Sequence, residues 1–401
     1  MKMLVFLGPL SVTAFLLSWS LATSYNIVCY FSSWAIYRPS EGKFDVPNID
    51  AHLCTHIIFA FIGSTDDGTL NILDPWESND ADEGGHYEGF RNLRKLKSEN
   101  PNLKVLLSLG SWKEGSKNIS IVAADPIKRK KLGWEALTLI EVYNFDGVDI
   151  FWEYANLEND TESEDKKNFV ELLKDFKSMY QPRGLLVTAA VAGIIDKIEL
   201  YNVKEVSENL DMMNVLSFDY HGAFDNFVGH VSPLHASSKD YDHGRNSTYT
   251  VATSIEYWLY KNADNKKINM GVVTYGRSFK LKDKSNTELY APIIGAGSKG
   301  PYTEISGFLG YNEICSINST YYWDDEQKVP HRVWGDQWVG FEDEDSLKLK
   351  VDFTVLWNLS GIMIWSLDTD DFLGNCGGGK YPLISTIKNR LKYHEDSLKG
   401  R

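Results

Sequence analysis

Residues 145–154, which read FDGVDIFWEY, contain three acidic side chains, and two of them, Asp149 and Glu153, have the types and spacing that could do chemistry. The apolar run at 148–152 predicts a buried strand. Alternate strand residues share a face, so Asp149, Phe151 and Glu153 point to the same side. Burying a carboxylate is costly unless it is paired or neutral. From these residues alone two interpretations stay open: an acidic site at the end of the strand, or a buried Asp satisfied by backbone donors beside an exposed Glu.

Eight short apolar runs alternate with amphipathic helical stretches, which predicts parallel strands covered on both faces. The runs lie at 27–31, 57–61, 105–109, 148–152, 185–190, 212–218, 268–273 and 361–365. This alternation indicates an α/β chain folded as a (β/α)8 TIM barrel, whose active sites lie at the carboxyl ends of the strands. Glu153 is therefore expected at this rim, with Phe151 below it and Asp149 deeper in the barrel.

The interval between the seventh and eighth runs is far longer than the others and is rich in Gly, Tyr and Asp. We expect it to form a small inserted α+β domain. The predicted division is a signal peptide at 1–24, the barrel at 25–275 and 346–393, the insertion at 276–345 and a C-terminal tail at 394–401.

The first residues have the features of a secretory signal peptide. Lys2 supplies a positive charge, residues 4–17 are largely apolar, and Ala22, Thr23 and Ser24 are small residues suited to cleavage near Ser24. No second apolar run of about 18 residues follows. We therefore expect secretion to the extracellular space without membrane association.

The charge balance restricts the classes of partner. The chain has 41 Lys and Arg against 55 Asp and Glu, a formal net charge of −14. An acidic chain without a basic block is a poor binder of nucleic acid or of anionic membranes. A neutral or cationic partner fits this composition better.

Four cysteines follow the predicted cleavage point, an even number on an oxidising route. They are Cys29, Cys54, Cys315 and Cys376. They allow three pairings, and the sequence alone does not choose among them, although Cys29–Cys54 with Cys315–Cys376 is the most local. The chain has no CxxC motif and the cysteines lie away from clustered histidines, so no metal and no cofactor is expected.

Secretion also makes the N-glycosylation sequons relevant. Candidate acceptors are Asn118, Asn159, Asn246 and Asn318. A fifth sequon, at Asn358, lies between apolar stretches, and we expect this side chain to be buried and unmodified.

The stretch around the two acids resembles the D-G-x-D-x-D-W-E-Y motif of family 18 glycoside hydrolases, the chitinases and chitinase-like lectins, here of the arthropod type. The matching residues are Asp146, Gly147, Asp149, Trp152, Glu153 and Tyr154. Further matches follow in family order along almost the whole chain: Cys29-Tyr30-Phe31-x-x-Trp34, Phe59-Ala60-Phe61, Ser108-Leu109-Gly110-Ser111-Trp112, Asp219-Tyr220-His221-Gly222, Tyr275-Gly276-Arg277-Ser278-Phe279, and Asp370-Asp371-Phe372-x-Gly374. The resemblance also implies the disulfides Cys29–Cys54 and Cys315–Cys376.

The resemblance implies a substrate-assisted mechanism. In this family a Glu protonates the glycosidic oxygen, the N-acetyl oxygen of the sugar attacks C1, and a neighbouring Asp orients the acetamido group. By position Glu153 is the general acid and Asp149 a supporting residue. Phe151 replaces the catalytic Asp, and Phe218 replaces a Tyr that helps to hold the N-acetyl group.

Most of the family's sugar-binding side chains are present. The resemblance assigns substrate contacts to Tyr30, Trp34, Phe61, Trp112, Phe218, Asp219, Tyr275, Arg277 and Trp365. Aromatic faces such as these stack on sugar rings. The implied partner is chitin or a chito-oligosaccharide, bound by a monomer.

These features leave three alternative hypotheses about function. The leading hypothesis is a secreted chitinase-like protein that binds chito-oligosaccharides with weak or absent hydrolysis, because Phe151 stands at the Asp position. The alternative is an active endochitinase that cleaves β-1,4-linked N-acetylglucosamine through Glu153. A further alternative is a signalling scaffold in which the cleft is vestigial.

Overall fold

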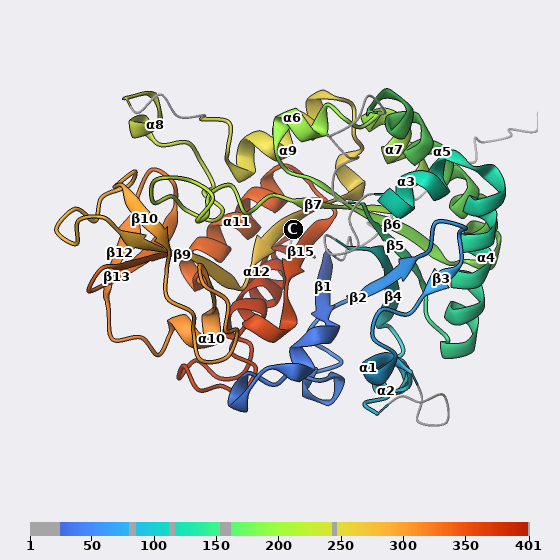
Figure 1. Cartoon of the computed structure of the whole chain (residues 1–401), viewed down its shortest axis with the longest axis horizontal. Coiled ribbons are helices and arrows are strands. Elements are labelled where there is room, and N and C mark those ends of the chain that lie inside the picture. The colour runs from blue at the N-terminus through green and yellow to red at the C-terminus, as the bar shows by residue number, and fades with distance from the viewer. Residues whose placement is uncertain (1–24, 80–85, 112–116, 153–161, 243–246, 400–401) are drawn as a thin grey trace, which may run out of the picture.

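The computed structural model describes residues 25–79, 86–111, 117–152, 162–242 and 247–399. Its centre is a closed barrel of eight parallel strands (Figure 1). They are β1 (Asn26–Ser32), β2 (His56–Ser64), β4 (Lys104–Gly110), β5 (Gly147–Phe151), β6 (Leu186–Ala192), β7 (Met212–Leu216), β8 (Ile268–Val273) and β15 (Gly361–Trp365). They run in the order β1-β15-β8-β7-β6-β5-β4-β2, and β2 pairs back with β1. Each predicted run coincides with one strand, so the (β/α)8 barrel is confirmed.

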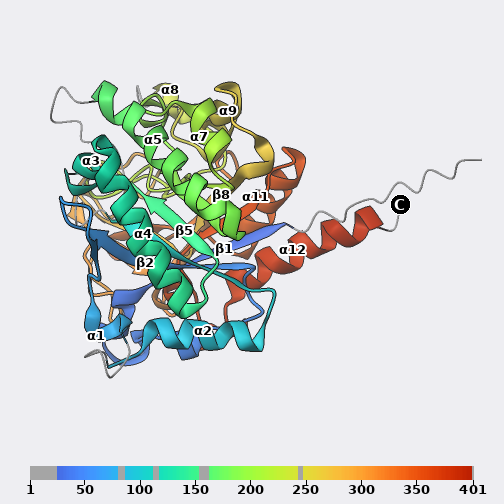
Figure 2. The ribbon, with the colours of Figure 1, turned by 90° about the vertical axis from the view of Figure 1, so that its right-hand side faces the viewer.

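Helices cover the outside of the barrel, as Figure 2 shows for α4 and α5. They are α1 (Pro75–Ser78), α2 (Gly89–Glu99), α3 (Lys117–Ala124), α4 (Pro126–Tyr143), α5 (Glu162–Tyr180), α6 (Ile195–Ile198), α7 (Val203–Asn209), α9 (Val251–Tyr260), α11 (Glu344–Leu356) and α12 (Pro382–Lys399). The short helix α8 (Ser238–Asp242) lies instead beside the insertion, where Lys239 pairs with Glu288. α12 continues to Lys399, so residues 394–399, assigned to a tail from the sequence, are helical.

Local sequence explains where these helices start and how they dock. The Asp125 side chain accepts hydrogen bonds from the backbone N–H groups of Ile127 and Lys128, and Pro126 occupies the first position of α4, where no N–H partner is needed. On α5 an apolar stripe is buried: Phe169, Leu172, Leu173 and Phe176. Because these residues recur at helical spacing, they hold one face of α5 against the barrel.

A second, antiparallel sheet interrupts the barrel between β8 and β15, at the left of Figure 1. It contains β9 (Tyr275–Leu281), β10 (Ile293–Ala296), β11 (Phe308–Gly310), β12 (Thr320–Asp324), β13 (Val329–Trp334) and β14 (Gln337–Gly340), with the short helix α10 (Tyr311–Ile314). Phe279 and Trp338 are fully buried in it. The predicted α+β insertion is therefore present, and its boundaries at 276 and 345 stay a prediction.

Both disulfides expected from the resemblance are formed, Cys29–Cys54 and Cys315–Cys376. The first joins β1 to the segment that precedes β2. The second joins the insertion to the segment that precedes α12. Each constrains the unfolded chain and contributes about 3–4 kcal/mol by loop-closure entropy.

The candidate glycosylation sites differ in their surroundings. Asn318 is exposed, whereas Asn118 is half-buried and its Nδ2 donates to the carbonyl oxygen of Ser64 at 2.9 Å. Asn159 and Asn246 lie outside the described residues. The expectation that Asn358 is buried was wrong: it is exposed, in a turn with φ of 54°, a left-handed conformation that Asn tolerates. Glycosylation itself stays a prediction.

Within the part of the chain that the structure describes, no helix has the length and apolar character needed to cross a membrane.

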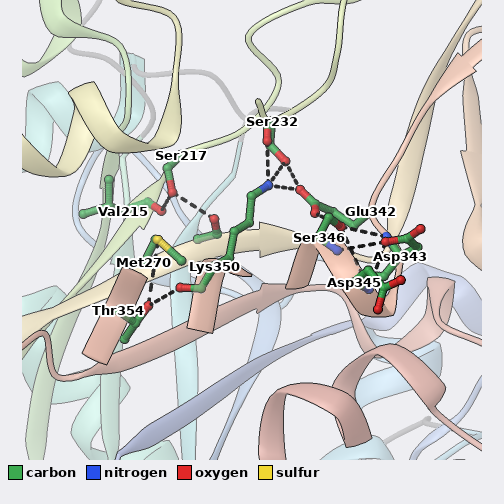
Figure 3. A network of polar contacts seen from close by, with 11 residues as sticks. Val215, Ser217, Ser232, Met270, Glu342, Asp343, Asp345, Ser346, Lys350 and Thr354 are labelled. Atoms are coloured by element: carbon green, nitrogen blue, oxygen red, sulfur yellow. Dashed lines mark hydrogen bonds and ion pairs between the residues drawn. The ribbon is translucent and has the colours of Figure 1, made fainter. Parts of the chain in front are cut away.

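Helix α11 carries a fully buried ammonium group, that of Lys350 (Figure 3). Its Nζ donates to the carbonyl oxygen and to the Oγ of Ser232 and forms an ion pair with Glu342. Glu342 also accepts hydrogen bonds from the Ser232 and Ser346 hydroxyls. All three ammonium donors are thus satisfied, which a buried charge requires. The ion pair joins α11 to the end of the insertion, and the hydrogen bonds of Ser232 tie both to the segment after β7.

Lys350→Met should destabilise the fold by about 3–5 kcal/mol, because it leaves the Glu342 carboxylate buried without its cation. Urea unfolding measures this difference. The matched control on the same helix is Lys348→Met, which removes an exposed pair with Asp345 and should change stability by at most about 0.5 kcal/mol. Equal effects of the two substitutions would contradict this role of Lys350.

A second buried acidic group, that of Asp370, contacts the start of α12. The Asp370 carboxylate accepts backbone N–H groups of Asp371, Leu383 and Ile384. Burial raises the pKa of Asp370 to about 7, although these three hydrogen bonds oppose the shift. The folded protein therefore holds a proton on Asp370 over a pH range in which an unfolded Asp has lost it.

The free energy of unfolding should fall as the pH rises from about 4 to about 7, because there the folded state binds one more proton than the unfolded state. The slope from one such proton is at most about 1.4 kcal/mol per pH unit. The Asn side chain of the Asp370→Asn variant cannot ionise, so the free energy of unfolding of this variant should lack the fall that Asp370 causes. Urea unfolding over the same pH range measures the difference. A slope unchanged from wild type would show that Asp370 titrates normally.

Candidate active site

A cavity of about 510 Å³ opens at the carboxyl ends of the barrel strands. The ends of four elements contribute to it: Ser32 closes β1, Phe151 closes β5, Leu216 closes β7 and Trp365 closes β15. This is the end of a (β/α)8 barrel at which active sites are built. Of the sequence-predicted site residues, the cavity is lined by Trp34, Phe151, Phe218, Asp219, Tyr275, Arg277 and Trp365.

Asp149 lies below the cavity, in the centre of the barrel. Its Oδ1 accepts from the hydroxyl of Thr188 at 2.6 Å and from Nδ2 of Asn214 at 3.3 Å. Its Oδ2 accepts from the hydroxyls of Tyr30 and Ser108, each at 2.8 Å. Burial raises the pKa of Asp149, and the four hydrogen bonds oppose this rise. The sequence left backbone donors as one interpretation, but the donors are side chains of four other barrel strands: β1, β4, β6 and β7.

Tyr30 keeps its proton at ordinary pH. Burial, followed by the charge of Asp149, raises the pKa of its phenol well above the usual value. The phenol therefore acts as a donor to Asp149. Tyr30 and Phe61, both predicted to contact substrate, pack under the cavity and do not line it.

Phe151, the last residue of β5, lines the cavity. It is only 3% exposed and packs against three rings: Phe61 with centroids 4.9 Å apart, Trp365 at 5.8 Å and Tyr30 at 6.4 Å. Asp149, two residues earlier on the same face, does not line the cavity. An apolar ring therefore stands at the position where the resemblance places the catalytic Asp.

Phe218 lies two residues beyond the end of β7, and its ring meets that of Tyr275 edge-on at 6.5 Å. It is nearly buried and lines the same cavity as Phe151. A phenyl ring at this position offers no hydroxyl to a bound ligand.

Asp219 and Arg277 form a polar wall of the cavity. The guanidinium donates from Nε and Nη2 to the two carboxylate oxygens, both at 2.7 Å. It also lies over the rings of Tyr275 and Phe308, 5.5 Å from each centroid. Burial disfavours the charged guanidinium and is the largest single influence on its pKa, but the charge and hydrogen bonds of Asp219 together with Tyr275 outweigh burial, so the pKa of Arg277 is raised. This bidentate pair joins the segment after β7 to β9 of the insertion.

Sequence reasoning missed several lining residues. Arg38 directly follows the short helix Ser33–Tyr37, which contains the predicted Trp34, and pairs with the buried Asp368 at 2.6 Å. Ile305 and Phe308 come from the insertion, and Phe308 stacks on Tyr275 at 4.4 Å. A single cation after a short helix, or a single ring at the start of a three-residue strand, carries no periodicity, so no sequence pattern could single it out.

Two predicted residues cannot be placed. Glu153, the expected general acid, and Trp112, an expected sugar contact, lie outside the described residues. Among the residues that are described, no group of three or more His, Cys, Asp or Glu side chains could hold a metal ion.

The chain belongs to glycosyl hydrolases family 18, whose sequence pattern it matches over residues 26–370. It is similar to Probable chitinase 2 of Drosophila melanogaster, with 38% identity over 93% of this chain and 81% of that protein. Among solved structures, the Group IV chitinase of Ostrinia furnacalis in complex with allosamidin matches with a TM-score of 0.87 and 39% identity, covering 92% of this chain and 99% of that chain.

A human relative is also similar. The structure of YKL-39, described as a pseudo-chitinase with retained chitooligosaccharide binding properties, matches with a TM-score of 0.83 and 34% identity, covering 92% of this chain and 100% of that chain. The chain is thus a chitinase or chitinase-like protein of family 18, and its neighbours include both an enzyme and a pseudo-enzyme.

Proposed function

We propose that this protein is a secreted chitinase-like protein that binds chito-oligosaccharides in the cavity and hydrolyses them weakly or not at all. The observation that carries the proposal is the position of Phe151, whose ring is packed among Tyr30, Phe61 and Trp365 where the family pattern has an Asp.

The cavity supports sugar binding. Trp34, Tyr275 and Trp365 present aromatic surface along it, and the Asp219–Arg277 pair supplies polar groups at its wall. Sugar rings stack on such faces through their C–H groups, and a few fixed polar groups set their orientation. Binding of chito-oligosaccharide by the neighbour YKL-39 supports the same assignment here.

The cavity floor disfavours hydrolysis. The substrate-assisted mechanism develops positive charge on the acetamido nitrogen, and a phenyl ring cannot accept its hydrogen bond or balance that charge. Loss of one preorganised electrostatic group lowers rates by about 10²–10³. Asp149 cannot replace it, because both its oxygens already accept side-chain donors and it does not line the cavity.

One sequence feature favours the alternative of a slow endochitinase. Glu153 is retained at the position of the general acid, so protonation of the leaving group stays available in principle. Turnover of a chito-oligosaccharide that Glu153→Gln abolishes would establish this alternative. If the protein is instead a signalling scaffold with a vestigial cleft, neither turnover nor binding in the cavity is expected.

Secretion belongs to the same proposal. Two disulfides, together with the signal-peptide pattern of residues 1–24, fit folding in an oxidising compartment.

Trp365→Ala should weaken the affinity for a chito-oligosaccharide at least about tenfold, because it removes a ring from the cavity floor. Calorimetric titration of the folded variant measures the loss. The matched control is Trp134→Ala, which removes a half-exposed ring on the outer face of α4 and should leave affinity unchanged. If both variants bind like wild type, the sugar site is not in this cavity.

The double substitution Phe151→Asp with Phe218→Tyr should raise hydrolysis by about 10²-fold or more. The new carboxylate, sharing a proton with Asp149, can accept the acetamido N–H, and the new hydroxyl can reach the N-acetyl oxygen. Both groups act on one transition state, so their effects should be coupled. Product release from chito-oligosaccharides measures the gain.

Two controls accompany this double variant. Adding Glu153→Gln should remove the gain. Phe151→Asn in place of Phe151→Asp should give a smaller gain, because an amide cannot balance the cation. A double variant that folds, binds oligosaccharide and turns over no faster than wild type would show that Phe151 is not the cause of low activity.

A further inference from the structure

The floor of the cavity is built from apolar side chains at the ends of the barrel strands. Phe151 ends β5, Leu216 ends β7 and Trp365 ends β15, while Phe218 follows β7 by two residues. None of these four side chains contains an oxygen atom. Their one polar atom is the indole Nε1 of Trp365, which is a donor only. The floor side chains therefore offer a bound ligand no hydrogen-bond acceptor.

The polar groups beneath the floor are already used. The Asp149 carboxylate accepts the hydroxyls of Tyr30, Ser108 and Thr188, and it also accepts from Asn214. The Tyr30 hydroxyl gives its proton to this carboxylate at 2.8 Å. Asp149 and Tyr30 are fully buried, and neither lines the cavity. A ligand on the floor therefore meets neither the carboxylate nor the phenol of this layer.

An acetamido group gains little from such a floor. It brings one N–H donor and one carbonyl acceptor, but the ring of Phe151 cannot accept from the N–H and the ring of Phe218 has no hydroxyl for the carbonyl. A site that hydrogen-bonds a substituent rejects an analogue without it by about 10⁴–10⁵, whereas an apolar site distinguishes ligands that differ by a methyl group only weakly. Here the unpaired N–H also offsets what the acetamido methyl group gains by burial.

The other lining groups contact features that glucose and N-acetylglucosamine share. Trp34 and Trp365 present rings to the C–H groups of a pyranose, which both sugars carry in the same arrangement. The Asp219–Arg277 pair offers charged atoms to sugar hydroxyls, and these too are common to both. The two sugars differ only at C2, where glucose has a hydroxyl in place of the larger acetamido group.

We propose, on the basis of the function proposed above, that the cavity does not select for the 2-acetamido group and also binds neutral β-1,4-linked glucose oligosaccharides. A hydroxyl at C2 is small enough to stay in contact with water above the floor, so it is not left unpaired as the acetamido N–H is. The phenyl rings of Phe151 and Phe218, which weaken hydrolysis, thus also widen the range of sugars that bind.

The test is calorimetric titration of the whole protein with an N-acetylglucosamine oligomer and with a β-1,4-linked glucose oligomer of the same length. The two dissociation constants should agree within about tenfold. The glucose oligomer should displace the N-acetylated one, and Trp365→Ala should weaken the binding of both. Displacement together with this shared loss places both ligands in the one cavity.

Variants of the floor should restore selectivity. They are made together with Glu153→Gln, so that turnover does not consume the ligand, and compared with Glu153→Gln alone. Phe151→Asp with Phe218→Tyr supplies an acceptor and a donor, and should raise the preference for the N-acetylated oligomer by about tenfold or more. Phe218→Tyr alone, the smaller change, should raise it by about threefold. The control is Tyr260→Phe, the reverse exchange on an exposed ring of α9, which should leave the preference unchanged.

The outcomes separate this proposal from the function on which it rests. If the N-acetylated oligomer binds and the glucose oligomer binds more than about tenfold more weakly or more tightly, only the proposal about selectivity is overturned. Failure of both oligomers to bind would overturn the proposed function as well. Folded floor variants whose preference matches that of Glu153→Gln alone would show that Phe151 and Phe218 do not set the selectivity, which also overturns the proposal.

Discussion

One buried carboxylate organises the centre of this barrel. Asp149 accepts hydrogen bonds from Tyr30 on β1, Ser108 on β4, Thr188 on β6 and Asn214 on β7. An unpaired carboxylate in this position would be strongly destabilising, so the donors must be held in place, and the strands that carry them are thereby held in register. The residues nearer the rim of the cavity pack on this layer of Asp149 and its four hydrogen-bond donors.

The aromatic layer above Asp149 decides what the cavity can do. Phe151, Phe61 and Trp365 pack together on top of the polar layer, so a ligand meets rings and not the carboxylate. The remaining polar wall, Asp219 with Arg277, is already paired within itself and bridges barrel and insertion. Such a floor favours stacking on a neutral sugar and leaves a developing cation without a counter-charge.

The repetitive parts of the molecule could be predicted from its sequence. Buried parallel strands need continuous apolar runs, and those runs located all eight barrel strands; ordered motifs then implied both disulfides and seven of the residues that line the cavity. What escaped prediction depends on contacts between elements that are not adjacent in the sequence. The Arg38–Asp368 pair and the Lys350–Glu342–Ser232 contacts join segments whose separation in sequence carries no period. Asn358 was misjudged because apolar neighbours suggested burial, whereas the backbone there makes an exposed left-handed turn.

The central proposal is that the cavity binds chito-oligosaccharides but hydrolyses them weakly or not at all. Measuring binding and hydrolysis in the same sample tests this proposal most directly. Wild-type protein would be titrated with a chito-oligosaccharide by calorimetry, and the same sample analysed by mass spectrometry after prolonged incubation. The account predicts saturable binding with the oligosaccharide recovered essentially intact. Rapid cleavage to shorter products, or the absence of any binding, would contradict it.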